Sequence, residues 1–175
     1  MTNSKKILRI LIPIIMLCIV CAIWILQSKK ENEDSLTKAN NNDFPLTITS
    51  IDMDELSKHK LPIIIDFGSD DCVPCKKMKP DLVDLNNAMQ GKAIVHFIDV
   101  WENPAATKDF PVQIIPTQIF VTKDGLPYVP SEEISSAIGF TRYTDGDKNH
   151  IFTSHEGGLS KEQMLLILKD MNKEE

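Results

Sequence analysis

The strongest constraint on the fold is an apolar run that ends in a polar turn and is followed at once by a helix-forming stretch. Residues 61–67 have the sequence LPIIIDF, and residues 68–71 interrupt the run with Gly, Ser and two Asp. Consecutive apolar positions are typical of a strand that is buried on both faces of a sheet. In residues 72–90 the apolar side chains recur at helical spacing, namely at Met78, Leu82, Leu85 and Met89. This succession predicts an α/β fold.

The other elements continue the alternation. We expect further strands at residues 46–50, 93–100 and 117–122, helices at residues 51–59 and 160–171, and a hairpin that pairs residues 138–143 with 150–154. Ser160 and Gln163 form a capping box that opens the last helix. Strands that alternate with helices and then end in a hairpin predict a central mixed sheet flanked by helices, with one antiparallel side.

An apolar segment near the N-terminus predicts a membrane anchor. Residues 10–26 contain no charged side chain, and about 20 such residues in a helix span the roughly 30 Å of a bilayer core. A cleaved signal peptide is the alternative, but it needs small residues after the run, and Trp-Ile-Leu-Gln at 24–27 supplies none. We therefore expect residues 7–27 to be a retained transmembrane anchor in contact with membrane lipid.

The flanking charges predict the orientation of this anchor. Three cations precede the uncharged run at 10–26 and two follow it, at Lys5, Lys6, Arg9, Lys29 and Lys30. Positive charge is retained on the cytoplasmic side, so residues 1–6 are expected inside the cell. Residues 28–43 are polar, without an apolar period, and are expected to form a flexible linker. A folded domain at 44–175 would then lie outside the cytoplasm.

The charge of this domain excludes one class of partner. The first thirty residues hold five of the 19 Lys and Arg and none of the 25 Asp and Glu, which leaves the rest of the chain with a net charge of −11. Such a body repels phosphate backbones, so we expect no nucleic-acid partner. No nucleotide-binding signature is present, and we expect no cofactor.

Four cysteines form two C-x-x-C pairs with different surroundings. Cys18 and Cys21 lie in the apolar span, where a thiolate is costly, and are expected to be unreactive. Cys72 lies where the buried strand turns into a helix, and the helix amino end should lower the pKa of its thiol below the ordinary value of about 8.5. Cys75, one turn later, can resolve a mixed disulfide. The second pair is therefore the expected redox site.

Two alternatives to redox chemistry remain open at this point. Cys72 and Cys75 are half of a zinc site, but His150 and His155 alone would complete it only loosely. A copper- or zinc-carrying module that uses the two cysteines and a histidine such as His155 is therefore one alternative. A non-catalytic scaffold with an inert disulfide is the other, although a bond that closes so short a loop removes little chain entropy.

Several motifs resemble the active-site region of thioredoxins. In chain order they are Ile65-Asp66-Phe67, Cys72-Val73-Pro74-Cys75-Lys76, Pro80, Ile115-Pro116-Thr117, Asp124-Gly125 and Leu159-Ser160-Lys161. The resemblance covers about residues 44–175 and implies a thioredoxin-like fold with an expanded C-terminal hairpin, preceded by one transmembrane helix. With its anchor, the chain resembles the bacterial membrane-anchored thioredoxin-like proteins that reduce disulfides on the outer side of the membrane.

The resemblance also assigns roles to individual positions. Cys72 would attack a substrate disulfide, and Cys75 would resolve the mixed disulfide. Asp66 would be a buried carboxylate that exchanges a proton with Cys75 through water, with its pKa raised by burial. Pro116 would hold a cis peptide bond after Ile115.

The resemblance further implies how the site meets its partners. Four residues, Val73, Pro74, Ile115 and Pro116, would contact the substrate. The implied partners are disulfide-containing proteins as substrates and a membrane-embedded thiol carrier as electron donor.

Three departures from the thioredoxin pattern affect these roles. Asp70-Asp71 replaces the usual aromatic residue before the first cysteine, and these carboxylates should oppose the helix dipole, with Lys76 and Lys77 as partial compensation. Phe97 stands where the family has a lysine near the buried acid. Residues 126–158 contain an insertion, which is either a lid or docking element above the site or an elongated hairpin without a role in recognition.

Overall fold

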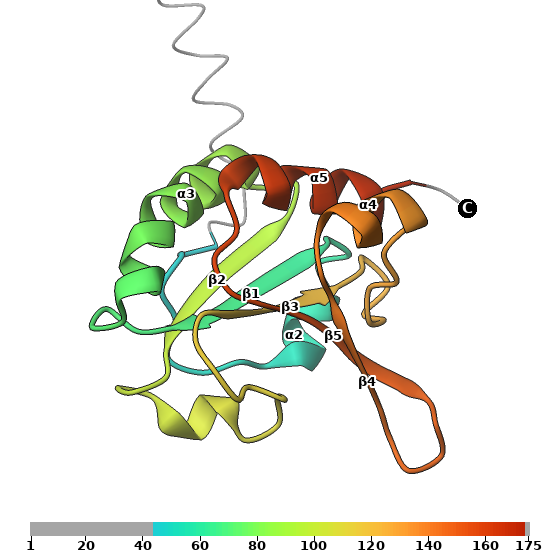
Figure 1. Cartoon of the computed structure of the whole chain (residues 1–175), viewed down its shortest axis with the longest axis horizontal. Coiled ribbons are helices and arrows are strands. Elements are labelled where there is room, and N and C mark those ends of the chain that lie inside the picture. Colours follow the sequence, from blue (N-terminus) through green and yellow to red (C-terminus); the bar gives the residue numbers. More distant parts are fainter. Residues whose placement is uncertain (1–43, 174–175) are drawn as a thin grey trace, which may run out of the picture. The chain divides into compact units, whose positions relative to one another are not determined.

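Five strands form one mixed sheet in the order β2-β1-β3-β5-β4 (Figure 1). The computed structural model describes residues 44–173, and its strands are β1 (Ile63–Gly68), β2 (Ile94–Asp99), β3 (Thr117–Val121), β4 (Thr141–Thr144) and β5 (His150–Glu156). β1 and β2 are parallel, whereas β3, β5 and β4 run antiparallel to their neighbours. The mixed sheet with one antiparallel side is therefore confirmed.

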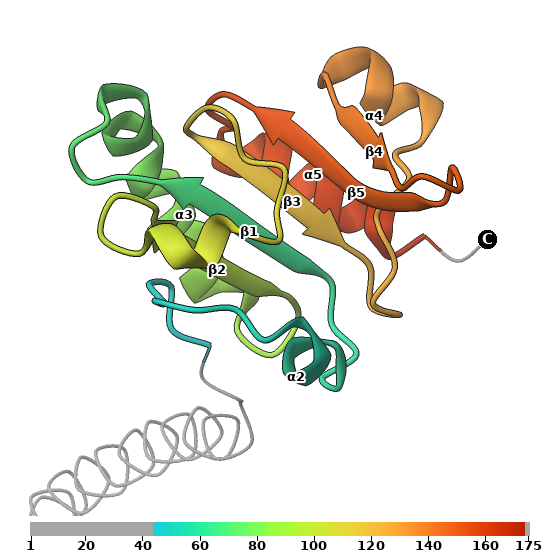
Figure 2. The same cartoon turned by 90° about the horizontal axis from the view of Figure 1, so that it is seen from below.

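Helices cover both faces of this sheet. They are α2 (Met53–Ser57), α3 (Val73–Met89), the 3-10 helix η1 (Pro104–Thr107), α4 (Glu132–Ala137) and α5 (Lys161–Met171). Figures 1 and 2 show α3 and α5 on one face and α2 with η1 on the other. The predicted capping box at the start of α5 is present, because the Ser160 hydroxyl accepts from Gln163 N–H and the Gln163 side chain accepts from Ser160 N–H.

Alternation along β1 divides the interior into two apolar clusters. Ile64 packs with Leu82 of α3 and Ile167 of α5 on one face of the sheet. Ile65 and its odd-numbered neighbours pack on the other face, where α2 and η1 cover them. All six residues of β1 are buried, as the apolar run predicted. Asp66 shares the face of Ile64, which places a carboxyl group beneath α3.

The structure corrects two element predictions. The expected edge strand at 46–50 is only a single bridge, in which Thr47 pairs in parallel with Phe97 of β2. The segment before the hairpin contains α4, which the sequence analysis did not predict. Ser131 caps α4 through its hydroxyl, and Ile134 anchors the helix in the core.

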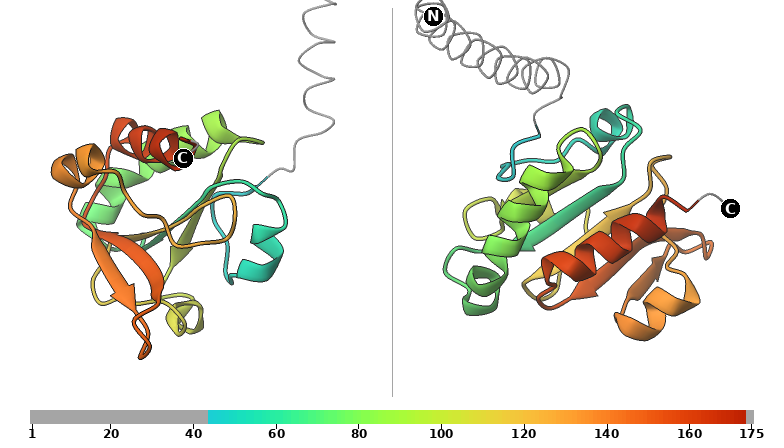
Figure 3. Two further views of the ribbon diagram at one scale, coloured as in Figure 1. Left: turned by 90° about the vertical axis from the view of Figure 1, so that its right-hand side faces the viewer. Right: turned by 90° about the horizontal axis from the view of Figure 1, so that it is seen from above.

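The predicted hairpin is present and adds a strand to the edge of the sheet (Figure 3). Its pairing begins at Thr141 rather than at Ile138, which instead follows α4 and is buried. The start of β3 pairs with the end of β5, at Thr117 and Glu156, so the turn before β5 lies at the opposite end of the sheet. Because Ile115 and Pro116 directly precede β3, this turn is remote from them. The turn of the hairpin therefore does not cover the cis-proline segment, and the role of the 126–158 insertion stays a prediction.

The predicted membrane segment lies outside the described residues. Within residues 44–173, no helix combines the length and the apolar character needed to cross a membrane. The anchor at 7–27, the cysteines Cys18 and Cys21, and the linker at 28–43 stay predictions.

A buried carboxylate ties α5 to the segment before α4. Asp170 accepts hydrogen bonds from Tyr128 Oη at 2.6 Å, from Ser131 N at 3.0 Å and from Lys173 Nζ at 2.9 Å. Burial opposes ionisation of Asp170, but these hydrogen bonds outweigh it and hold the pKa of the carboxyl below its ordinary range. The charged form is therefore the stabilising one.

Asp170→Ala should lower the free energy of unfolding by about 3 kcal/mol, because it leaves buried donors without an acceptor. Urea denaturation of the full chain at pH 7 measures this loss. Lys173→Ala is the matched control, and it should cost less than about 1 kcal/mol because the lysine side chain is 55% exposed. The stabilisation should be complete above the unfolded-state pKa near 4 and should fall as the pH drops below it. Equal losses in both variants would contradict this assignment.

Candidate active site

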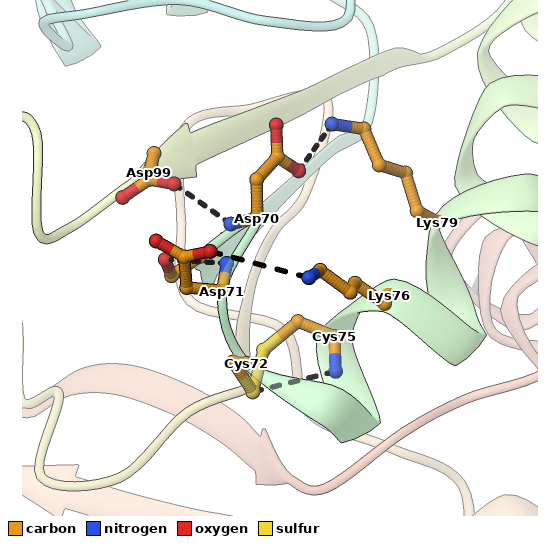
Figure 4. Close-up of polar contacts among 8 residues, drawn as sticks. Asp70, Asp71, Cys72, Cys75, Lys76, Lys79 and Asp99 are labelled. Atoms are coloured by element: carbon orange, nitrogen blue, oxygen red, sulfur yellow. Dashed lines mark hydrogen bonds and ion pairs between the residues drawn. A yellow bond between two sulfur atoms is a disulfide. The ribbon is translucent and has the colours of Figure 1, made fainter.

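Both sulfurs lie at the amino end of α3. Cys72 is the N-cap of this helix, with an extended backbone, and the Cys75 N–H donates to Cys72 Sγ at 3.4 Å (Figure 4). The two residues form a disulfide, with their Cα atoms 5.2 Å apart. Pro74 lies in the first turn, where a missing N–H costs no helical hydrogen bond. The free amides and the dipole of a 17-residue helix therefore favour a thiolate at Cys72 once the disulfide is reduced.

Both cysteine residues are buried in the disulfide form, Cys72 slightly less than Cys75. Cys72 is 9% exposed and Cys75 is 4% exposed. Cys72 Sγ lies 3.9 Å from the carbonyl oxygen of Ile115, and the Ile115-Pro116 peptide bond is cis, as the resemblance to thioredoxins implied. The segment before β3 therefore lies against the outer sulfur. Because Cys72 is the N-cap of α3 and lies beside this segment, we expect it to be the sulfur that meets an incoming disulfide.

Asp66 lies beneath the disulfide, in the interior. It is 1% exposed, and burial raises its pKa to about 7 although a hydrogen bond from Gln118 opposes the rise. Gln118 Nε2 donates to Asp66 Oδ1 at 2.7 Å from the neighbouring position on β3. A carboxyl group with a pKa near 7 can accept and return a proton at neutral pH. The sequence analysis predicted the buried acid but not its amide partner.

Gly68 brings Cys75 and Asp66 together. A Cβ atom at Gly68 would lie 3.3 Å from Cys75 Sγ and 3.4 Å from Asp66 Oδ2, and it would meet the Phe97 ring at 2.8 Å. The sulfur and the carboxylate oxygen therefore both border the space beside this glycine. A side chain at position 68 would occupy that space.

Lysines of α3 balance the two acids before Cys72 (Figure 4). Asp71 lies 4.0 Å from Lys76 Nζ, and Asp70 forms an ion pair with Lys79. The sequence analysis predicted Lys76 and Lys77 as the compensating cations, and Lys79 takes the place of the second. These pairs reduce the repulsion that the carboxylates would exert on a thiolate at Cys72.

Asp99 fixes the loop that carries these acids. At the end of β2, its carboxylate accepts from the backbone N–H of Asp70 at 2.8 Å and of Trp101 at 2.9 Å. Partial burial opposes ionisation, but the backbone hydrogen bonds outweigh it and lower the pKa of Asp99. A fixed carboxylate thus holds residues 69–71 in place beside the amino end of α3.

Phe97 occupies the position at which the thioredoxin family has a lysine near the buried acid. It pairs in register with Asp66 across β1 and β2. Lys79 Nζ lies 5.1 Å from the centroid of the Phe97 ring, so a cation from α3 covers the aromatic face. The cation near this part of the site is therefore Lys79 of α3, whereas the family lysine would lie on β2.

The predicted substrate-contact residues differ in exposure. Val73 is 78% exposed and Pro74 is exposed, whereas Ile115 is half-buried and Pro116 is buried. A substrate would therefore meet the side chains of the first three residues rather than the ring of Pro116.

Two exposed apolar residues near the disulfide end of the sheet were not among the predicted substrate-contact residues. Ile114 is 53% exposed and precedes the cis peptide bond. Trp101 is 60% exposed and follows β2, whose carboxyl end lies beside that of β1 because the strands are parallel. The sequence signal that could have identified Trp101 as a surface residue near the site is a tryptophan in a polar loop that follows a buried strand.

The histidines considered for a metal site are engaged elsewhere. His155 Nδ1 lies 2.7 Å from the Gly139 carbonyl oxygen, and His150 Nε2 lies 2.8 Å from Thr153 Oγ1. In the part of the chain that the structure describes, no group of three or more His, Cys, Asp and Glu side chains is placed to hold a metal ion.

Comparisons with known proteins place this site in a family. The thioredoxin family model matches residues 44–138, more than half of the chain. Thioredoxin from Alicyclobacillus acidocaldarius is 30% identical over 99 residues, which cover 53% of this chain and 93% of the relative. Thioredoxin 1 from Chlorobaculum tepidum is 35% identical over 95 residues, which cover 49% of this chain and 94% of the relative.

A solved structure of chloroplastic thioredoxin z is 23% identical, covers 72% of this chain and 92% of that chain, and has a TM-score of 0.49. The family match spans the strand, the C-x-x-C helix and the cis-proline segment described above. The chain belongs to the thioredoxin family and is a thioredoxin-like protein-disulfide oxidoreductase.

Proposed function

We propose that this protein is anchored in the cell membrane by residues 7–27 and reduces disulfides of proteins outside the cytoplasm. The uncharged run at 10–26 and the three cations before it support the anchor and its orientation. The position of Cys72 at the amino end of α3, and of Cys75 and Asp66 beside Gly68, supports the chemistry.

The reaction follows from the arrangement of three groups. The Cys72 thiolate attacks a substrate disulfide, forms a mixed disulfide and releases the first substrate thiolate. Cys75 loses its proton to Asp66 and attacks Cys72 Sγ, which releases the second substrate sulfur. The substrate gains two electrons, and the protein is left with the Cys72–Cys75 disulfide. The observation that carries this assignment is the approach of Cys75 Sγ and Asp66 Oδ2 to Gly68, on the inner side of the disulfide.

Exposed apolar side chains support a polypeptide as the substrate. Val73, Ile114 and Trp101 offer apolar surface at the edge of the sheet where Cys72 lies. An extended segment on either side of a substrate disulfide could bury these side chains while its sulfur approaches Cys72. Electrons must then return to the Cys72–Cys75 disulfide, and a membrane-embedded thiol carrier is the donor that we propose.

Capture of substrates in intact cells tests location and chemistry together. In the full chain with Cys18→Ser and Cys21→Ser, a membrane-impermeant maleimide should label Cys72 before lysis, after mild reduction. The Cys75→Ser variant should accumulate mixed disulfides with extracytoplasmic proteins, because the first attack proceeds and the resolving step does not.

The control for this capture is the Cys72→Ser, Cys75→Ser double variant, which should capture nothing. Labelling that requires lysis would place the domain inside the cell. Captured proteins that are exclusively cytoplasmic would refute the location as well.

A further inference from the structure

A neutral amide is fixed against the buried carboxylate of the site. Gln118 is fully buried, and its Nε2 donates to Asp66 Oδ1 at 2.7 Å and lies 3.1 Å from the Gly157 carbonyl oxygen. Both partners are acceptors, so the amide nitrogen must face them. Asp66 Oδ1 is therefore held on the side of β3.

The other oxygen of Asp66 has different surroundings. Oδ2 lies 3.4 Å from the point where a Cβ on Gly68 would stand, and Cys75 Sγ lies 3.3 Å from the same point. The carboxylate thus directs one oxygen at Gln118 and the other toward the resolving sulfur. Rotation of the carboxyl group would break the hydrogen bond to Gln118.

Packing alone gives no reason for an amide at position 118. Its neighbours on this face of the sheet are apolar, among them Ile64 and Phe120. Within residues 44–173 the Gln118 Oε1 atom has no hydrogen-bond partner, and an unpaired buried oxygen costs free energy. An apolar side chain of similar size would pack there but would leave Asp66 Oδ1 and the Gly157 carbonyl oxygen without this donor, so these two contacts distinguish glutamine here.

We propose that Gln118 is a positioning residue for the resolving step: it fixes Asp66 Oδ1, so that Oδ2 exchanges the proton with Cys75. This inference rests on the proposed function. In the step, the proton of the Cys75 thiol passes to Asp66 Oδ2, directly or through one water molecule. A bond forms between Cys75 Sγ and Cys72 Sγ, the bond from Cys72 to the substrate sulfur breaks, and that sulfur leaves as a thiolate. Asp66 then returns its proton to solvent.

Other charged or titratable residues lie on the elements packed around Asp66. Asp99 follows on the same face of β2, at the position paired with Gly68. Lys79 of α3 lies over the Phe97 ring, and His155 of β5 pairs in register with Gln118. Of these, histidine is the residue type that ordinarily titrates near neutrality, so His155→Gln belongs among the controls.

The test compares Gln118→Met with Ser154→Ala in the full chain that carries Cys18→Ser and Cys21→Ser. Ser154 is also fully buried with an unpaired oxygen. It lies on β5 and pairs with Ile119, the neighbour of Gln118 on β3. The readout is the pH dependence of the resolving step, measured as release of the second aromatic thiol from a chromogenic aryl disulfide. Loss of a hydrogen bond to the charged carboxylate should move the midpoint upward by about one pH unit in Gln118→Met. The profiles of Ser154→Ala and His155→Gln should not move.

Two further measurements separate positioning from a general structural effect. In an Asp66→Asn background, Gln118→Met should produce no additional shift. NMR titration of the Asp66 carboxyl carbon in the disulfide form, which needs no turnover, should show the same upward shift in Gln118→Met and in Gln118→Leu. An unmoved carboxyl titration, or a shift that persists without Asp66, would overturn the proposal. Absence of turnover in the parent chain would instead refute the proposed function.

Discussion

Cys72→Ser should reduce the rate of insulin disulfide reduction by dithiothreitol to the uncatalysed background, in the full chain that carries Cys18→Ser and Cys21→Ser. The expected loss is about 10³-fold or more, the scale on which covalent catalysts respond to removal of the nucleophile. The physical reason is that Cys72 is the N-cap of α3, where its sulfur receives the Cys75 N–H. A serine hydroxyl in its place does not ionise near neutral pH.

Cys75→Ser is the matched control for this result. It should retain the first attack, so a chromogenic aryl disulfide should release one equivalent of aromatic thiol instead of two. Catalysis by Cys72→Ser at the parental rate would show that the sulfur at position 72 is not the attacking atom. Release of two equivalents by Cys75→Ser would remove Cys75 from the resolving role.

Asp66→Asn should slow the resolving step about 10²-fold at pH 7, the lower range for loss of a general base. In the parent chain, release of the second aromatic thiol should rise with pH through about 7 as Asp66 loses its proton, and then level off. In Asp66→Asn the same step should instead follow the ionisation of Cys75 itself. The first release, which reports the attack by Cys72, should be nearly unaffected and serves as the internal control.

The same substitution should stabilise the fold above neutral pH. Burial raises the pKa of Asp66 from 3.8 to about 7, so the native protein keeps a proton that the unfolded chain loses between these values. Stability therefore falls as the pH rises from about 4 to about 7, by up to about 4 kcal/mol at about 1.4 kcal/mol per pKa unit. Asp66→Asn should remove this fall in urea denaturation at a series of pH values. A variant that is both slower and less stable at pH 8 would indicate damage to the fold instead of loss of the base.

The sequence predicted the layered architecture because its elements are locally strong. Residues 63–65 are three consecutive isoleucines, and such a run is compatible with little other than a buried strand. Leu82 and Leu85 recur at helical spacing behind the cysteines, and both are buried in α3. The capping box at Ser160 fixed the start of α5 at the correct residue.

The missed features depend on contacts between distant segments. α4 has only six residues, too few for an apolar period to be visible, although the cap at Ser131 was a local signal. Gln118 faces Asp66 because β1 and β3 pair antiparallel in one register, which no local pattern specifies. Lys79, not Lys77, pairs with Asp70 because it is the lysine on the side of α3 that faces the loop.

The short strand β4 also affects how other polypeptides can bind to the edge of the sheet. Without β4, the whole length of β5 would present free amide and carbonyl groups, a template on which another polypeptide can add a strand. β4 covers this rim with only four residues, and its pairing is irregular between Tyr143 and Thr144. An interrupted, solvent-facing rim of this kind recruits extended chains poorly. Another polypeptide should therefore engage this protein at the sulfur end of the sheet rather than along the β4 side, and fibrous self-assembly along that side is disfavoured.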